Sequence, residues 1–262
     1  MKFGKWLKQQ IHATLPSWRD KYLSYKELKQ LVRLLSSGPT SLLNGSPMNG
    51  KAESEFVHFL NNEIDKFNTF YMEQEEDFII RHKELRMRIK RVNELWGPSR
   101  FHPSEMDRKE EMTKIRKDIV DFHGAMVLLI NYSNINYTGL AKILKKYDKR
   151  TGGLLRFLFI QKVLEQPFFM TELISDLVKE CEGMIELILP VEEQEVERAH
   201  EARESITVAG EGIFRNTVAA LLTMQEIRRG SSTESSFSLP PLNLPDSDLI
   251  RLIQLNSSLT II

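Results

Sequence analysis

Apolar residues recur at helical spacing over two long stretches of this chain, and no segment sustains the alternation of apolar and polar residues that marks a strand. The first stretch runs from Lys51 to about Leu95, and its length suggests a hairpin of long helices. Its apolar face consists of Phe56, Leu60, Ile64, Phe67, Phe70 and Tyr71. The second stretch extends from Ser104 to Lys149. The sequence therefore predicts an all-α protein built on long helices.

The ends of the second long helix carry recognisable signals. Ser104 follows Pro103 and precedes Asp107 by three positions, which is the pattern of a helix N-cap. Thr151 is followed by Gly152 and Gly153, where a glycine can take the left-handed capping conformation. We expect the helix to end at these glycines.

Shorter helices are expected on both sides of the long ones. Their predicted ranges are 2–13, Lys21–Leu35, Leu154–Leu164, Phe168–Leu189 and about Glu192–Arg229. A loop is predicted over Ser36–Gly50, which is rich in Ser, Gly, Pro and Asn. Beyond Gly230 the Ser-, Thr- and Pro-rich sequence predicts a disordered tail, within which Leu249–Leu255 could fold on a partner.

Several classes of protein are disfavoured by what the sequence lacks. Cys181 is the only cysteine, which excludes an intramolecular disulfide and indicates a reducing, intracellular compartment. Apolar runs such as Ala125–Ile130 are far shorter than the roughly 18 to 20 residues that cross a bilayer. The six histidines show no metal-ligand spacing, and neither a phosphate-binding glycine loop nor a nucleophile motif is present. We therefore expect no enzyme, no metal site and no cofactor.

Charge is balanced overall but separated along the chain. The sequence contains 36 basic and 36 acidic residues, yet its first 35 residues hold eight basic residues against two acidic ones. A second basic run spans Lys142–Arg150 and includes one acid, Asp148, while acids gather at Glu73–Asp77 and Glu192–Glu204. Separated zones of this kind indicate a polyanionic partner on one face.

The second basic run has a definite geometry if it is helical. Lys142, Lys145, Lys146 and Lys149 then share one arc of about 100°, opposite the apolar Leu140, Ile143, Leu144 and Tyr147. Asp148 lies to the side and cannot neutralise the lysines. Like charges four residues apart cost roughly 0.2 to 0.5 kcal/mol per pair in an isolated helix. A group outside the helix is expected to compensate them, although a solvated lysine face is the simpler alternative.

The first basic zone contains a second candidate pair. Tyr25 and Lys29 are four residues apart and project from one helix face. A phenol hydroxyl and an ammonium group can both donate hydrogen bonds to a phosphate oxygen, and the ammonium adds charge. The alternative is that Tyr25 belongs to the core with its hydroxyl at the rim.

Three separated segments resemble the signature regions of SPX domain proteins. They are Met1–Lys5, Leu15–Lys29 and Asn136–Leu140 continuing into Lys142–Lys149. In addition, Lys162–Phe169 is similar to the extension of the stand-alone plant members of this family. The resemblance covers about residues 1–189. With it, we expect an SPX domain over residues 1–165, a C-terminal helical extension over 166–229 and a disordered tail over 230–262.

The resemblance implies a helical bundle with two long helices, an N-terminal helical hairpin and additional C-terminal helices. It also implies a basic surface that binds inositol polyphosphates and pyrophosphates. The family's phosphate-binding cluster corresponds to Tyr25, Lys29 and Lys146, and its lysine surface cluster corresponds to Lys142, Lys145 and Lys149. Lys2 and Lys5 are weaker candidates because the family varies more at its N-terminal helix.

The resemblance to the stand-alone plant type further implies a sensor of cellular phosphate status. With an inositol pyrophosphate bound, such a sensor binds a MYB coiled-coil (PHR-type) transcription factor of the phosphate starvation response and holds it off DNA. Nucleus, cytoplasm or both are the expected locations.

Two other functions are compatible with the basic zones. A direct nucleic-acid binder is disfavoured by the net charge of zero and by the lack of a recognisable reading module. A module that binds a membrane surface or phosphoinositides is the stronger rival, because residues 2–13 form a basic amphipathic segment that contains Trp6. A helical scaffold that binds partners without ligand gating is a further alternative.

Overall fold

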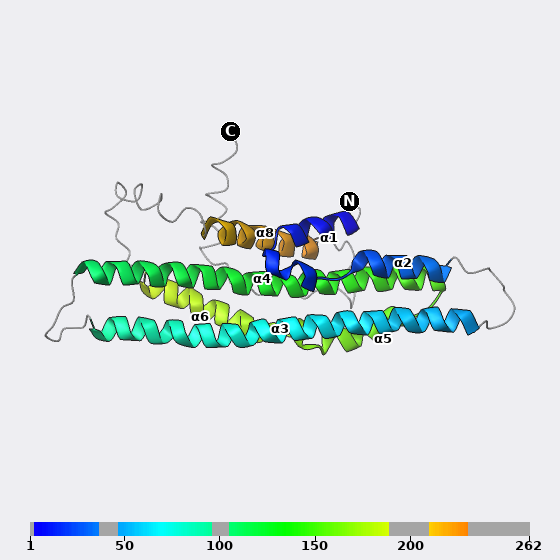
Figure 1. Ribbon diagram of the computed structural model, residues 1–262, viewed down its shortest axis with the longest axis horizontal. Helices are drawn as coiled ribbons and strands as arrows, with labels where there is room; N and C mark the ends of the chain where they lie inside the picture. The colour runs from blue at the N-terminus through cyan, green and yellow to red at the C-terminus, as the bar shows by residue number, and fades with distance from the viewer. Residues whose placement is uncertain (1–2, 37–46, 96–104, 189–209, 230–262) are drawn as a thin grey trace, which may run out of the picture.

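The computed structural model of the chain describes residues 3–36, 47–95, 105–188 and 210–229. Two long helices dominate it, α3 (Pro47–Leu95) and α4 (Glu105–Thr151), which run antiparallel along the length of the molecule (Figure 1). The hairpin predicted within Lys51–Leu95 is wrong, because this stretch is one uninterrupted helix. The hairpin of long helices is formed by α3 together with α4. The expected all-α fold is confirmed, because every regular element in the described ranges is helical.

Shorter elements surround this pair. On the N-terminal side they are α1 (Phe3–His12), a 3₁₀ helix η1 (Pro16–Lys21) and α2 (Tyr25–Ser36). On the C-terminal side they are α5 (Leu155–Leu164), a 3₁₀ turn η2 (Pro167–Phe169), α6 (Glu172–Ile188) and α8 (Gly210–Arg229). In Figure 1, α1 and α8 lie side by side over the middle of α4, and α2 lies over its C-terminal half.

The predicted core face of α3 is buried throughout, from Phe56 to Tyr71. Almost every side chain of α4 between Phe122 and Tyr137 is also buried, including polar ones such as Asn131 and Asn136. The middle of α4 is buried all round because α2, α3, α6 and α8 all pack on it. This helix is therefore the axis of the bundle.

Several predicted boundaries are confirmed and others are wrong. Gly152 ends α4 with a φ of +72°, as the glycine pattern predicted. Helix α3 starts at Pro47, inside the predicted loop, since proline is well suited to the first helical position, where its missing N–H leaves no bond unmade. Phe168 lies in the 3₁₀ turn rather than in a helix, because its N–H donates to the side chain of Asn68 at 3.3 Å. The Ser104 cap, the helix from Glu192 up to residue 209 and the tail lie outside the described residues.

The prediction that a helix begins at Lys21 is wrong, and this correction matters most for the site. Lys21 ends η1, Tyr22 is extended with φ −75° and ψ 166°, and α2 begins only at Tyr25. Side chains of both long helices stabilise this break. They accept hydrogen bonds from backbone N–H groups that would bond within the helix if it were continuous. Tyr25 is thus the first residue of a helix and not a residue within one.

Candidate polyanion-binding surface

The start of α2 is anchored by three residues of the long helices. The N–H of Leu23 donates to Oδ1 of Asn136 on α4 at 3.0 Å, and the N–H of Ser24 donates to Oε2 of Glu63 on α3 at 2.8 Å. Lys66 neutralises Glu63 at 2.8 Å and also donates to the carbonyl oxygen of Tyr22 at 3.0 Å. The position of Tyr25 relative to α4 is therefore fixed by backbone contacts on both sides.

The side chain of Tyr25 is half-buried at the start of α2. Its ring meets the ring of Phe3 edge-on at 5.0 Å, and partial burial raises the pKa of its hydroxyl. The hydroxyl therefore stays protonated at neutral pH and can donate a hydrogen bond. Tyr25 is half-buried and packs against the core, so part of its side chain stays accessible to a ligand.

Lys29 and Lys146 are brought together across α2 and α4. Both side chains are half-buried. Burial lowers the pKa of Lys146, and the nearby charges of Lys29, Arg150 and Arg33 lower it further. An ammonium group surrounded by cations in this way is stabilised by a bound anion.

The three remaining lysines of the predicted arc on α4 are exposed, and the opposite side of the helix is buried, as the helical wheel predicted. The three are Lys142, Lys145 and Lys149. Asp148 is engaged elsewhere: its carboxylate accepts the N–H of Arg156 at 3.2 Å, at the start of α5. Among the ion pairs of the described residues, none includes Lys29 or a lysine of this α4 face.

Of the two N-terminal candidates, the structure describes only Lys5. Lys2 lies outside the described residues, and Lys5 is exposed on α1. Two cations outside the predicted site, Arg33 and Arg150, are also close enough to lower the pKa of Lys146. Their signal was present in the sequence, because Arg33 follows Lys29 by four residues and Arg150 follows Lys146 by four.

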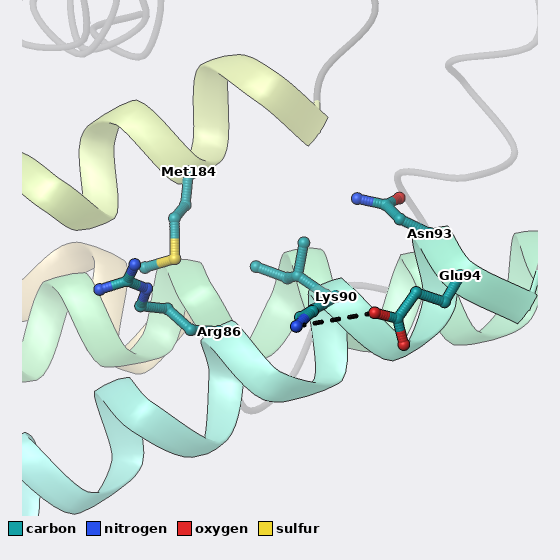
Figure 2. Close-up of a pocket in the computed structure, with 6 residues that line it drawn as sticks. Arg86, Lys90, Asn93, Glu94 and Met184 are labelled. Atoms are coloured by element: carbon teal, nitrogen blue, oxygen red, sulfur yellow. Dashed lines mark ion pairs between the residues drawn. The ribbon is translucent and has the colours of Figure 1, made fainter. Parts of the chain in front are cut away.

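A cavity of about 380 Å³ lies at the other end of the bundle, between α3 and α6. Figure 2 shows Arg86, Lys90, Asn93 and Glu94 reaching into it from α3 and Met184 from α6. Lys90 is paired with Glu94 at 3.7 Å, and Arg86 contacts Glu180 at 3.8 Å. Its cations already have carboxylate partners, so this cavity is a poorer polyanion site than the lysine face.

The described residues contain no group of three or more His, Cys, Asp or Glu side chains that could hold a metal ion. Within the same ranges, no helix has the length and apolar character needed to cross a membrane.

Comparison with known proteins gives the class of this chain. The family model "SPX domain" matches residues 1–37 and 99–163. "SPX domain-containing protein 3" of Arabidopsis thaliana is 59% identical over 264 residues and covers all of both chains. "SPX domain-containing protein 3" of Oryza sativa subsp. indica is 50% identical and covers 97% of this chain and 93% of its own. The chain belongs to the SPX domain family.

Two further matches agree with this assignment. "SPX domain-containing protein 1" of Arabidopsis thaliana is 49% identical and covers 95% of this chain and 94% of its own. Among solved structures, the SPX domain of Chaetomium thermophilum glycerophosphodiester phosphodiesterase 1, in complex with inositol hexakisphosphate, matches with a TM-score of 0.47 and 21% identity. That match covers 72% of this chain and 99% of the other.

Proposed function

We propose that this protein binds inositol polyphosphates or pyrophosphates and reports cellular phosphate status through that binding. The observation that carries the proposal is the group of cations around Lys146. Lys29, Arg33 and Arg150 all lower the pKa of Lys146, and no carboxylate pairs with Lys146 or Lys29 in the described residues. A ligand with several phosphates matches such a site, because each phosphate can accept charge-assisted hydrogen bonds.

Each candidate residue has a distinct part in this proposal. Tyr25, Lys29 and Lys146 form the centre, where a neutral hydroxyl and two ammonium groups donate to one phosphate. Lys142, Lys145 and Lys149 supply an exposed surface for the phosphates around the inositol ring. Lys5 would approach from α1, and Lys2, which precedes that helix in the sequence, is proposed as a further ligand residue. A proton-transferring or nucleophilic group has no part in this arrangement, so we propose a binding protein and not an enzyme.

Titration calorimetry with inositol hexakisphosphate tests the proposal. Lys146→Ala should weaken binding by about 1 to 3 kcal/mol, the range for hydrogen bonds to charged groups, and Ala is well suited to a helix. Lys117→Ala is the matched control, since Lys117 is an exposed lysine of the same helix, far from the cluster along α4. Affinity that is unchanged in Lys146→Ala, or equally weakened in both variants, would remove Lys146 from the site.

Salt provides an independent test of the same site. Binding through several lysines should weaken as ionic strength rises, because mobile ions screen exposed charges beyond about 8 Å at 0.15 M. An affinity that is indifferent to salt contradicts an electrostatic site.

We further propose that the ligand-bound protein binds and inhibits a MYB coiled-coil transcription factor of the phosphate starvation response. Family membership supports this step, and the proposal places the protein in the nucleus, the cytoplasm or both. If the ligand favours the state that binds the partner, the partner must raise ligand affinity by the same factor. Coupling of this kind is typically about 5- to 150-fold.

The partner step is tested with a coiled-coil fragment of such a factor, with and without inositol hexakisphosphate or a pyrophosphate. The native chain should bind the fragment more tightly with ligand, whereas Tyr25→Phe, Lys29→Ala and Lys146→Ala should respond much less. Equal affinity in every condition would identify a scaffold without ligand gating.

The alternative of a membrane-surface module is weakened by the packing of α1. Trp6 and Leu7, two of the apolar residues that would enter a lipid surface, are buried against the protein, and the other two, Phe3 and Ile11, are partly buried against the core. Lys5 and Lys8 remain exposed on the other side of α1. Sedimentation with vesicles that contain phosphoinositides should therefore depend on the lysines and should be displaced by free inositol hexakisphosphate.

A further inference from the structure

Helix α8 comes from the C-terminal part of the chain, yet it lies against α1 at the other end of the sequence (Figure 1). Two hydrogen bonds join them. The hydroxyl of Thr223 donates to Oε1 of Gln10 at 2.6 Å, and Nε1–H of Trp6 donates to Oε2 of Glu226 at 3.4 Å. The later residue of α8 pairs with the earlier residue of α1, so the two helices run antiparallel with a defined register.

Helix α8 is itself seated closely on α4. A Cβ atom at Gly124 would come within 2.5 Å of Cγ2 of Ile213 and 2.7 Å of Oγ1 of Thr217. Glycine is required there because the α8 side chains pack directly on the α4 backbone. Thr217, Ala220, Thr223 and Met224 of α8 are buried. Helix α8 is thus a fixed support on the axis of the bundle, and α1 is attached to that support.

The attachment continues to the proposed ligand site through aromatic rings. The ring of Trp6 lies 5.3 Å from the ring of Phe3, which in turn meets the ring of Tyr25 edge-on at 5.0 Å. A chain of contacts therefore runs from Glu226 through Trp6 and Phe3 to Tyr25. The edge-to-face pair of Phe3 and Tyr25 belongs to a class that contributes about 0.5 to 1.5 kcal/mol beyond the area it buries.

We propose that α8 positions Tyr25 for its anionic ligand by holding α1 in place, so that the C-terminal helix and the ligand site are energetically coupled. This inference rests on the proposed function, because it assumes that Tyr25 contacts the ligand. Tyr25 is the first residue of α2, and its ring is held against Phe3 of α1. If α1 moves away, the Tyr25 ring loses that neighbour and its hydroxyl becomes less well ordered. Thr223 and Glu226 are positioning residues in this account and do not touch the ligand.

The decisive variant is Thr223→Val with Glu226→Ala in the full chain, which removes both hydrogen bonds between α8 and α1. Calorimetry with inositol hexakisphosphate should show affinity reduced by about 3- to 10-fold, the effect of losing about one net hydrogen bond. Thr223→Ser with Glu226→Gln keeps a hydroxyl donor and an acceptor at the two positions, and it should restore most of the affinity. Gln225→Ala is the control, because Gln225 is an exposed neighbour on α8.

A double-mutant cycle separates positioning from general destabilisation. In a Tyr25→Phe background the hydroxyl is absent, so the removal of both hydrogen bonds should change affinity by less than about 2-fold, which is within the usual error of additivity. A full 3- to 10-fold loss in that background would show that α8 does not act through Tyr25 and would overturn the proposal.

Hydrogen exchange supplies a readout that does not depend on the variants. Linkage requires that the ligand stabilise α8 as well as α1, so inositol hexakisphosphate should slow amide exchange in both helices of the native chain. Protection of α1 without α8 would overturn the coupling. If the native chain fails to bind the ligand at all, the proposed function fails and this inference fails with it. If the native chain binds and removal of both hydrogen bonds changes nothing, only this inference fails.

Discussion

The two ends of the α3–α4 pair differ in how their charged side chains are partnered. At the end formed by the C-terminus of α3 and the N-terminus of α4, Arg88 bridges Asp118 at 2.6 Å and Glu111 at 3.0 Å. Lys114 pairs with Glu110 at 2.7 Å, and Lys90 pairs with Glu94 at 3.7 Å. We call this the paired end. At the other end, which we call the lysine end, Lys29 and Lys146 lie together with Arg33 and Arg150 nearby.

The difference shows that charge, rather than shape, identifies the candidate site. The cavity of about 380 Å³ is at the paired end, where carboxylates already satisfy the cations that line it. At the lysine end, Asp148 caps the start of α5 and does not neutralise the lysines beside it. Neither Lys29 nor Lys146 is in an ion pair among the described residues, and the proposed polyanion would supply the negative charge that these two lysines lack.

The largest effect is expected from a substitution that gives the lysine end a carboxylate partner like those of the paired end. Lys146→Glu places a carboxylate among Lys29, Arg33 and Arg150 and turns repulsion into attraction. We expect affinity for inositol hexakisphosphate to fall by at least about 100-fold, because a charged hydrogen bond is lost and a like charge faces the ligand. Calorimetry measures the affinity, and thermal unfolding should show a ligand-free protein at least as stable as the native one. Lys117→Glu, on the same helix, should bind normally, and a comparable loss in that variant would contradict the assignment.

The next largest effect concerns the packing that positions Tyr25. A Cβ atom at Gly139 would lie 2.5 Å from Cδ2 of Leu23, whose side chain is buried next to the start of α2. Gly139→Ala should cost about 1 to 3 kcal/mol from overpacking, offset in part by about 1 kcal/mol of helix propensity. Urea unfolding measures the stability, and ligand affinity should fall as Leu23 shifts.

Gly183→Ala on α6 is the matched control for that substitution, because nothing lies within 4 Å of the added Cβ atom. It should stabilise the protein by up to about 1 kcal/mol and leave ligand affinity unchanged. Equal stability changes in the two alanine variants would show that Leu23 relaxes freely and does not fix Tyr25.

At the paired end, the same logic predicts an effect on stability alone. Arg88→Ala removes two partly exposed ion pairs and leaves Asp118 and Glu111 without their cation. The loss of stability should be about 0.5 to 1 kcal/mol, since exposed pairs contribute little, and it should shrink in high salt. Affinity for inositol hexakisphosphate should not change, and a clear loss would mean that both ends contribute to ligand binding.

The sequence predicted the parts of this molecule that depend on local periodicity. The spacing of one helix period predicts the buried face of α3 and the lysine arc of α4. The conformational freedom of glycine predicts the end of α4 at Gly152. The break before Tyr25 depends on residues that are distant in the sequence, so local periodicity does not predict it. The N–H of Leu23 donates to Asn136, and the N–H of Ser24 donates to Glu63. The contact between α8 and α1 was missed for the same reason, since Gln10 and Thr223 are 213 residues apart.

The smallest expected effect tests whether the lysine end is strained without its ligand. Lys146→Ala should leave the ligand-free protein slightly more stable, by about 0.2 to 0.5 kcal/mol, because Lys146 and Arg150 are like charges four residues apart. The pKa of Lys146 is lowered in the folded protein, so the protonated side chain reduces the free energy of unfolding. This destabilisation disappears as pH rises toward the ordinary lysine value of about 10.4, because the side chain of the folded protein is then neutral. Urea unfolding of both proteins at neutral and alkaline pH should therefore show a difference that narrows as pH rises. A Lys146→Ala protein that is less stable than the native chain at neutral pH would show that a partner within the chain compensates Lys146, and the case for an external polyanion at this end would lose its main support.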